Sequence, residues 1–149
     1  MKIAFDLDDL LIPTTIKFSV GSNSATFPLS LICREKLRVG AVELISNLAK
    51  SNDIYIYTTS LRSRTYITIW FFCLGIRLKR VINSSVHRSV VANTKYSKFS
   101  KAPKLFGIDM LVDDSPGVKI ECIEQGVRCL IIDKYDDHWV STVKNEIQC

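Results

Sequence analysis

Short apolar runs, separated by helical patterns or turns, are the strongest pattern along the chain. They predict strands at residues 2–6, 54–57, 81–82, 110–112 and 127–132. Strands that alternate with helices favour parallel pairing with right-handed crossovers, and helices then cover both faces of the sheet. The pattern therefore predicts an α/β fold: a Rossmann-like three-layer sandwich with a parallel sheet and helices on both faces.

The segments between these runs differ in their periodicity. Apolar residues at helical spacing predict helices over residues 39–50, 61–74, 116–125 and 137–147. Gly75 is a natural C-terminal cap for the second helix, and Pro116 suits the first turn of the third. Residues 83–103 are polar and poorly periodic, so we expect mostly loop there.

Residues 13–37 form the least regular part of the sequence. Turn residues and prolines alternate there with threonines and aromatic residues, which favours a small flap insertion, either a β-hairpin or an ordered loop. This length suffices for a flap but not for a separate cap domain. With no internal repeat and no linker, residues 1–149 are expected to form a single domain.

Composition adds a modest constraint. Apolar residues make up 47% and charged residues 23% of the chain, which is an ordinary globular balance. The formal charge of +5 suits an anionic substrate such as a phosphate ester. Nucleic-acid or nucleotide binding is also compatible with this charge, but the lysines and arginines are scattered, as on a solvated surface. A homodimer is equally compatible with the sequence.

The sequence shows no pattern typical of a signal peptide, a membrane span or a zinc site. Three aspartates follow the first apolar run at once, and the most apolar run, residues 67–74, is far shorter than the roughly 20 residues of a membrane span. The five cysteines include no C-x-x-C pair, and His87 and His138 have no zinc-ligand spacing. We therefore expect a cytoplasmic protein with reduced thiols and no membrane partner.

Side chains suited to catalysis follow three of the predicted strands: Asp6, Asp8, Thr58, Asp113 and Asp114. In an open parallel sheet the ligand site lies at the carboxyl ends of the strands, so these residues should share one edge. Crowded carboxylates repel one another unless a cation lies among them. Ligands that are all oxygen atoms favour Mg²⁺ over zinc or copper.

Four segments also resemble, in order, the motifs of haloacid dehalogenase-like (HAD) hydrolases of the small phosphatase type with a minimal cap. They are Asp6-Leu7-Asp8-Asp9, Tyr57-Thr58-Thr59-Ser60, Lys101 and Val112-Asp113-Asp114-Ser115. The resemblance spans residues 2 to 132. Leu10 departs from the family pattern, which commonly has threonine there, and this removes a hydroxyl near the nucleophile loop.

The resemblance implies a Mg²⁺-dependent phosphohydrolase that cleaves phosphomonoesters. Asp6 would attack phosphorus and form an aspartyl-phosphate, which splits one difficult displacement into two easier ones. Asp8 would act as general acid and then as general base. Asp6, Asp114 and the backbone carbonyl of Asp8 would hold Mg²⁺, and Asp113 would support the metal through water.

The resemblance further implies that hydroxyls and a lysine bind the phosphoryl oxygens, whose charge must be stabilised in the transition state. Thr58 and Thr59 are the candidate hydroxyl residues. Four lysines precede the acidic strand: Lys95, Lys98, Lys101 and Lys104. We favour Lys101, because its place shortly before the strand resembles the family's lysine, with Lys104 as the alternative.

Several of these residues also have a purely structural interpretation. Asp9 is best read as a helix cap, and hydroxyls near Thr58 could cap the following helix. Arg62 and Arg64 could either hold a substrate anion or lie on a solvated helix face. We expect His87 to be a surface residue in a loop.

Other functional classes fit the sequence less well. A phospho-receiver domain would need its acceptor aspartate where the second strand instead ends in Thr58. A calcium-binding loop starting at Asp6 would need glycine at its sixth position, which is Leu11, and glutamate at its twelfth, which is Lys17. The remaining alternative is a non-catalytic HAD-fold module that binds phosphate or a protein partner.

Overall fold

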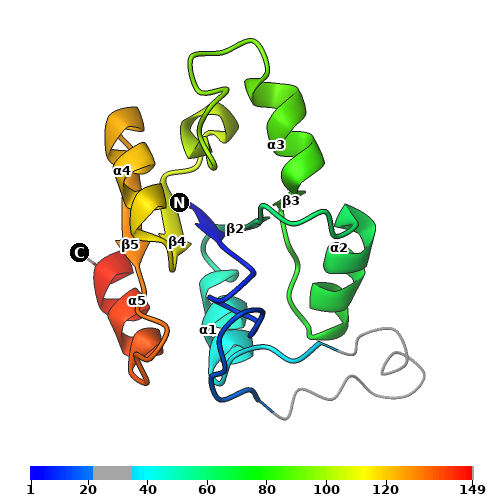
Figure 1. Cartoon of the computed structure of the whole chain (residues 1–149). Helices are drawn as coiled ribbons and strands as arrows, with labels where there is room; N and C mark the ends of the chain where they lie inside the picture. Colours follow the sequence, from blue (N-terminus) through cyan, green and yellow to red (C-terminus); the bar gives the residue numbers. More distant parts are fainter. Residues whose placement is uncertain (22–34, 149) are drawn as a thin grey trace.

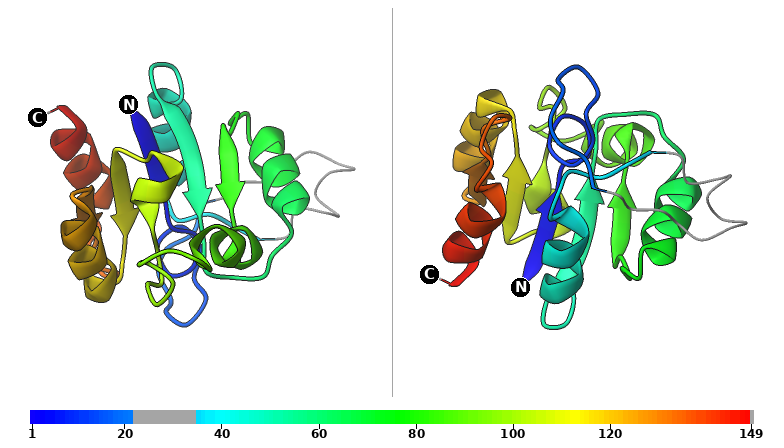
Figure 2. Two further views of the ribbon diagram at one scale, coloured as in Figure 1. Left: turned by 90° about the horizontal axis from the view of Figure 1, so that it is seen from above. Right: turned by 90° about the horizontal axis from the view of Figure 1, so that it is seen from below.

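The computed structural model describes residues 1–21 and 35–148. These residues form a five-stranded sheet with the strand order β3-β2-β1-β4-β5, in which every neighbouring pair is parallel (Figure 2). The strands are β1 Lys2–Phe5, β2 Asp53–Tyr57, β3 Arg80–Ile82, β4 Met110–Asp113 and β5 Arg128–Ile131. Because every pair is parallel, all five carboxyl ends lie at the same edge of the sheet.

Helices cover both faces of this sheet, which confirms the predicted three-layer α/β fold. Figure 1 shows the two layers on opposite sides of the strands. On one side lie α1 Ala41–Leu48, α2 Arg64–Cys73 and α5 Trp139–Gln148; on the other lie α3 Ser84–Val91, the 3₁₀ helix η2 Pro103–Phe106 and α4 Pro116–Gln125. None of the helices in these described ranges combines the length and apolar character needed to cross a bilayer.

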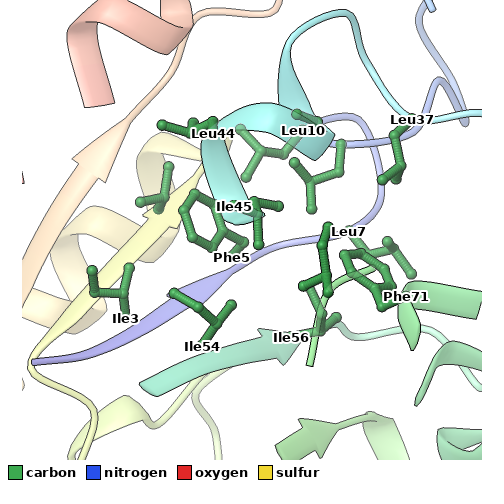
Figure 3. Packing of buried hydrophobic residues seen from close by; sticks show 14 of the residues in the cluster. Ile3, Phe5, Leu7, Leu10, Leu37, Leu44, Ile45, Ile54, Ile56 and Phe71 are labelled. Carbon is green, nitrogen blue, oxygen red and sulfur yellow. The ribbon is translucent and has the colours of Figure 1, made fainter. Parts of the chain in front are cut away.

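Strand β1 is central because it contributes to two apolar clusters. Ile3 and Phe5 point to the layer that contains α1, where they pack near Leu44 and Ile45 (Figure 3). Ala4, which lies between them, belongs to the cluster on the opposite face. A strand buried on both faces must be apolar at successive positions, which explains why β1 lacks polar alternation.

The register of β1 determines where the chain after it emerges. Phe5 pairs with Ile56 of β2 and with Val112 of β4. The backbone N–H of Asp6 still donates to the Val112 carbonyl at 2.9 Å, so Asp6 is fixed by the sheet although it follows the strand. The chain after Asp6 then turns at the carboxyl edge of the sheet, between the ends of β2 and β4.

The prediction that residues 83–103 are mostly loop missed α3, which occupies Ser84–Val91, whereas most of the other residues in this range form turns or irregular structure. Asn83 caps this helix by accepting a backbone N–H with its side chain at 3.2 Å. The buried face of the helix consists of Ser84, His87 and Val91. Two of these three residues are polar, and only three of the eight residues in the helix are apolar, so the segment reads as polar overall.

Helix α2 begins later than expected. Ser63 is its N-cap and accepts the N–H of Tyr66, so the helix starts at Arg64 instead of residue 61. The hydroxyls nearer to β2 are therefore not caps of this helix, and Thr58 is left for another role.

The ends of the predicted flap lie beside each other. Val20 and Arg38 form an antiparallel bridge, and the Gly21 N–H donates to the Leu37 carbonyl at 2.9 Å. An antiparallel stem is the expected base of a hairpin. The rest of the predicted flap, residues 22–34, lies outside the described residues.

Candidate active site

Three charged side chains meet at the carboxyl end of the central strands. Lys101 donates from Nζ to Asp6 Oδ1 and to Asp113 Oδ2, the second at 2.5 Å. Asp6 follows β1, Asp113 ends β4, and Lys101 precedes η2, so three separate segments build the cluster. The Lys101 side chain is only 2% exposed, which makes this a buried ion-pair network.

Burial disfavours the charged forms of Asp6 and Lys101 in this cluster. Burial raises the pKa of Asp6 to about 7, with Asp113 adding to the rise and Lys101 opposing it. For Lys101, burial alone would lower the pKa, but Asp6 and Asp113 reverse this and raise it. One ammonium group therefore does not fully compensate the two buried carboxylates, and a further cation would favour their ionised state.

A third carboxylate completes a set suited to such a cation. One carboxylate oxygen each from Asp6, Asp113 and Asp114 lie within 4.8 Å of one another. Asp114 is half-buried, and its pKa is raised by this burial and by Asp113. A set made only of carboxylate oxygens fits Mg²⁺ by the chemistry of its donors. The backbone carbonyl of Asp8 stays a predicted further ligand.

Asp8 lies in the loop after β1 and is held by three donors. Its Oδ2 accepts from the Thr58 hydroxyl at 2.9 Å. Its Oδ1 accepts from the Thr14 hydroxyl at 2.9 Å and from Arg62 Nη1 at 2.6 Å. The candidate acid–base residue is thus fixed in position by three donors from two segments, the loop after β1 and the connection between β2 and α2.

Arg62 links this carboxylate to the end of the 13–37 segment. Its Nη2 donates to Glu35 Oε1 at 2.9 Å, and the Tyr66 hydroxyl donates to the other Glu35 oxygen at 3.2 Å. We considered two roles for Arg62: binding a substrate anion, or lying on a solvated helix face. Its pairing with Asp8 and Glu35 matches neither role. Because its partners lie 27 and 54 residues away, no local pattern could have revealed it.

The predicted phosphate-binding residues separate into two groups. Thr58 is fully buried, and its Oγ1 accepts the Ser60 N–H at 3.0 Å while donating to Asp8. Thr59 is exposed beside it. Lys104 is also exposed, and its backbone N–H donates to Gln125. The structure thus brings Thr58 and Lys101 to the carboxylates, whereas the alternative Lys104 lies apart, as do the exposed Lys95 and Lys98.

Asp9 is not a helix cap, contrary to our interpretation. It adopts a positive φ of 60°, which only short polar side chains and glycine tolerate readily. Its carboxylate accepts backbone N–H groups from Thr14 at 2.9 Å, Thr15 at 2.7 Å and Ile16 at 3.2 Å. Burial would raise the pKa of Asp9, but a hydrogen bond from the Thr15 hydroxyl, together with these backbone hydrogen bonds, lowers it. Asp9 therefore folds the loop that carries Thr14 to Asp8.

His87 is buried, not a surface residue as expected. Its Nδ1 lies 2.6 Å from the Tyr57 hydroxyl and its Nε2 lies 3.0 Å from the Phe99 carbonyl. The carbonyl can only accept, so Nε2 carries the proton and Nδ1 accepts from Tyr57, whose oxygen accepts the Ala102 N–H at 2.8 Å. A neutral imidazole satisfies every group in this chain and secures the segment that carries Lys101.

This arrangement makes stability depend on pH. Burial lowers the pKa of His87 below its ordinary 6.5, so the unfolded chain binds a proton before the folded one does. The stability contributed by neutral His87 is present above pH about 6.5 and is lost as the pH falls through that value. His87→Gln should therefore lose less free energy of unfolding than wild type between pH about 7.5 and about 5.5 in urea denaturation. His138→Gln, at an exposed histidine, is the control; equal pH dependence in all three proteins would contradict the assignment.

Comparison with known proteins supports the fold. No protein-family model matches the sequence, and no curated protein matches it. The fold is similar to that of a solved structure described as a predicted HAD-like family hydrolase from Porphyromonas gingivalis, with a TM-score of 0.54. The match covers 99% of this chain and 98% of that chain at 10% sequence identity. The chain thus has the HAD-like fold that its motifs resemble.

Proposed function

We propose that this chain, which has the fold of HAD-like hydrolases, is a Mg²⁺-dependent phosphohydrolase that cleaves phosphomonoesters through an aspartyl-phosphate on Asp6. The observation that supports the proposal most is the buried cluster of Asp6, Lys101 and Asp113 at the carboxyl edge of the sheet. Asp8 and Thr58 are hydrogen-bonded to each other at the same edge. Nucleophile, cation, hydroxyl and acid–base group are therefore available together.

The proposed reaction has two displacements at phosphorus. In the first, an Asp6 oxygen forms a bond to phosphorus while the bond to the leaving oxygen breaks, and Asp8 gives that oxygen a proton. In the second, water attacks the phosphorus of the aspartyl-phosphate, Asp8 takes the proton from the water, and Asp6 is released with inorganic phosphate. Asp8 thus regains the proton that it gave away.

The other residues hold charge and position. Lys101 would donate to the phosphoryl oxygens as their charge changes, and Thr58 would do so once its single hydroxyl hydrogen turns from Asp8 to the substrate. Bound Mg²⁺, held by Asp6 and Asp114 with Asp113 in support, would supply further charge stabilisation at those oxygens. Thr14 and Arg62, which both donate to the same Asp8 oxygen, keep the acid–base group in one orientation.

Hydrolysis of an aryl phosphate tests the proposal. We expect release of inorganic phosphate by the full chain with Mg²⁺ and loss of that release when a chelator removes the metal. Release that is equal with and without Mg²⁺ would contradict the role of the metal. If a panel of phosphomonoesters gives no release under any condition, the chain is instead a non-catalytic phosphate-binding or interaction module with this fold.

A further inference from the structure

A pocket of about 220 Å³ lies beside the proposed phosphoryl site. Thr59 and Ser100 form part of its wall, and they are the chain neighbours of Thr58 and Lys101. The pocket therefore opens between the two segments that bring the hydroxyl and the ammonium group to the carboxylates. A substrate held at that site by its phosphoryl group therefore has this pocket beside it.

One cation in the wall of this pocket is not neutralised. Arg88 of α3 donates from Nε and Nη2 to the Ser84 hydroxyl at 3.1 and 2.8 Å. Among the described residues, no carboxylate oxygen lies within 4.0 Å of its guanidinium, and its Nη1 has no hydrogen-bond partner. Arg62, by contrast, is paired with both Asp8 and Glu35.

The nearby carboxylate of Glu121 has other partners. It accepts the N–H of Ser100 at 2.8 Å, the Ser100 hydroxyl at 2.6 Å and the N–H of Lys101 at 3.0 Å. Three donors therefore hold it on the segment next to the pocket. Arg88 is left as a cation that a ligand can reach without first breaking an ion pair.

We infer that this pocket receives the leaving-group part of the substrate and that Arg88 binds a second anionic group on it. This inference rests on the proposed function and specifies the substrate class: a small phosphomonoester that carries a carboxylate or a second phosphate. Guanidinium binds both anions in the same bidentate manner. The volume is below the roughly 300 Å³ at which pockets for drug-sized ligands begin, so the anionic group belongs to a small leaving group.

A matched pair of substrates tests the inference. Propyl phosphate and the phosphate ester of 3-hydroxypropanoate have leaving groups of similar size, but only the second carries a carboxylate. Wild type should prefer the carboxylated ester in kcat/KM by about tenfold to a hundredfold, the range expected for a hydrogen bond to a charged group. The preference should come mainly from a lower KM, because the contact is distant from the reacting phosphorus.

Arg88→Met keeps the aliphatic stem but removes the charge, and it should bring the two kcat/KM values to within about twofold of each other. Arg88→Lys should retain part of the preference, because it keeps the charge but not the bidentate geometry. Lys119→Met removes one charge from an exposed position on α4 and should leave the preference unchanged.

The outcomes separate this inference from the proposed function. If wild type hydrolyses both esters with equal efficiency, or if Arg88→Met keeps the wild-type preference, the inference is overturned while the proposed function stands. If wild type hydrolyses neither ester nor any aryl phosphate in Mg²⁺, both are overturned. A preference that falls in Arg88→Met but not in Lys119→Met supports the assigned pocket.

Discussion

Asp6→Asn is expected to abolish Mg²⁺-dependent phosphatase activity while the protein stays folded. An amide cannot form the bond to phosphorus, so the loss should be on the order of 10⁴-fold or more, as for other nucleophile replacements. The fold should survive because asparagine has nearly the same shape and Lys101 keeps its contact with Asp113. Phosphate release from an aryl phosphate measures the activity, and circular dichroism with urea denaturation measures the fold.

Asp53→Asn provides a matched control for this change. Asp53 begins β2, at the sheet edge opposite the candidate active site, and within the described part of the chain it forms a single, exposed ion pair with Lys79. This variant should retain nearly full turnover. If Asp6→Asn kept more than a few per cent of wild-type turnover, Asp6 would not be the nucleophile.

Lys101→Met is expected to destabilise the metal-free protein by about 3–5 kcal/mol, the usual cost of removing one partner from a buried ion pair. The change leaves Asp6 and Asp113 buried without their shared cation. Urea denaturation in the presence of a chelator measures the loss. Lys104→Met, three residues away at an exposed position, should change the free energy of unfolding little.

Added Mg²⁺ should stabilise Lys101→Met more than it stabilises wild type. Without the ammonium group, the carboxylates of Asp6, Asp113 and Asp114 repel one another more strongly, so a cation gains more by binding among them. Tighter binding to the folded state raises stability further by mass action. Equal stability of the two metal-free proteins, or an equal Mg²⁺ response, would show that Lys101 does not balance this cluster.

The sheet could be predicted because its inner strands β1, β2 and β4 are buried on both faces. Runs such as Ile54–Tyr57 and Met110–Val112 carry the apolar signal at every position, so even three or four residues suffice. The face of α3 that packs inward contains Ser84 and His87, whose polar groups are satisfied by hydrogen bonds. Because only three of its eight residues are apolar, the segment looked polar and the sequence alone suggested a loop.

Topology made most of the site predictable, and Lys101 was found through the motif resemblance. Because parallel strands end at one edge, residues that follow β1, β2 and β4 must lie near one another, whatever their separation in the chain. The pairing of Arg62 with Asp8 and Glu35 depends instead on side-chain directions in two loops. The positive φ of Asp9 likewise follows from the local turn and not from a residue pattern.

The central claim is that a phosphoryl group is transferred to Asp6, and trapping that group in Asp8→Asn tests it most directly. An activated nitrophenyl ester needs little acid assistance, so it should still phosphorylate Asp6, whereas the water step loses its base. Rapid mixing with Mg²⁺ should give a burst of one nitrophenolate per protein molecule, and mass spectrometry of its peptides should find the phosphoryl group on Asp6. A wild type that turns over the ester, beside an Asp8→Asn protein that shows no burst or carries the phosphoryl group on another residue, would contradict the claim.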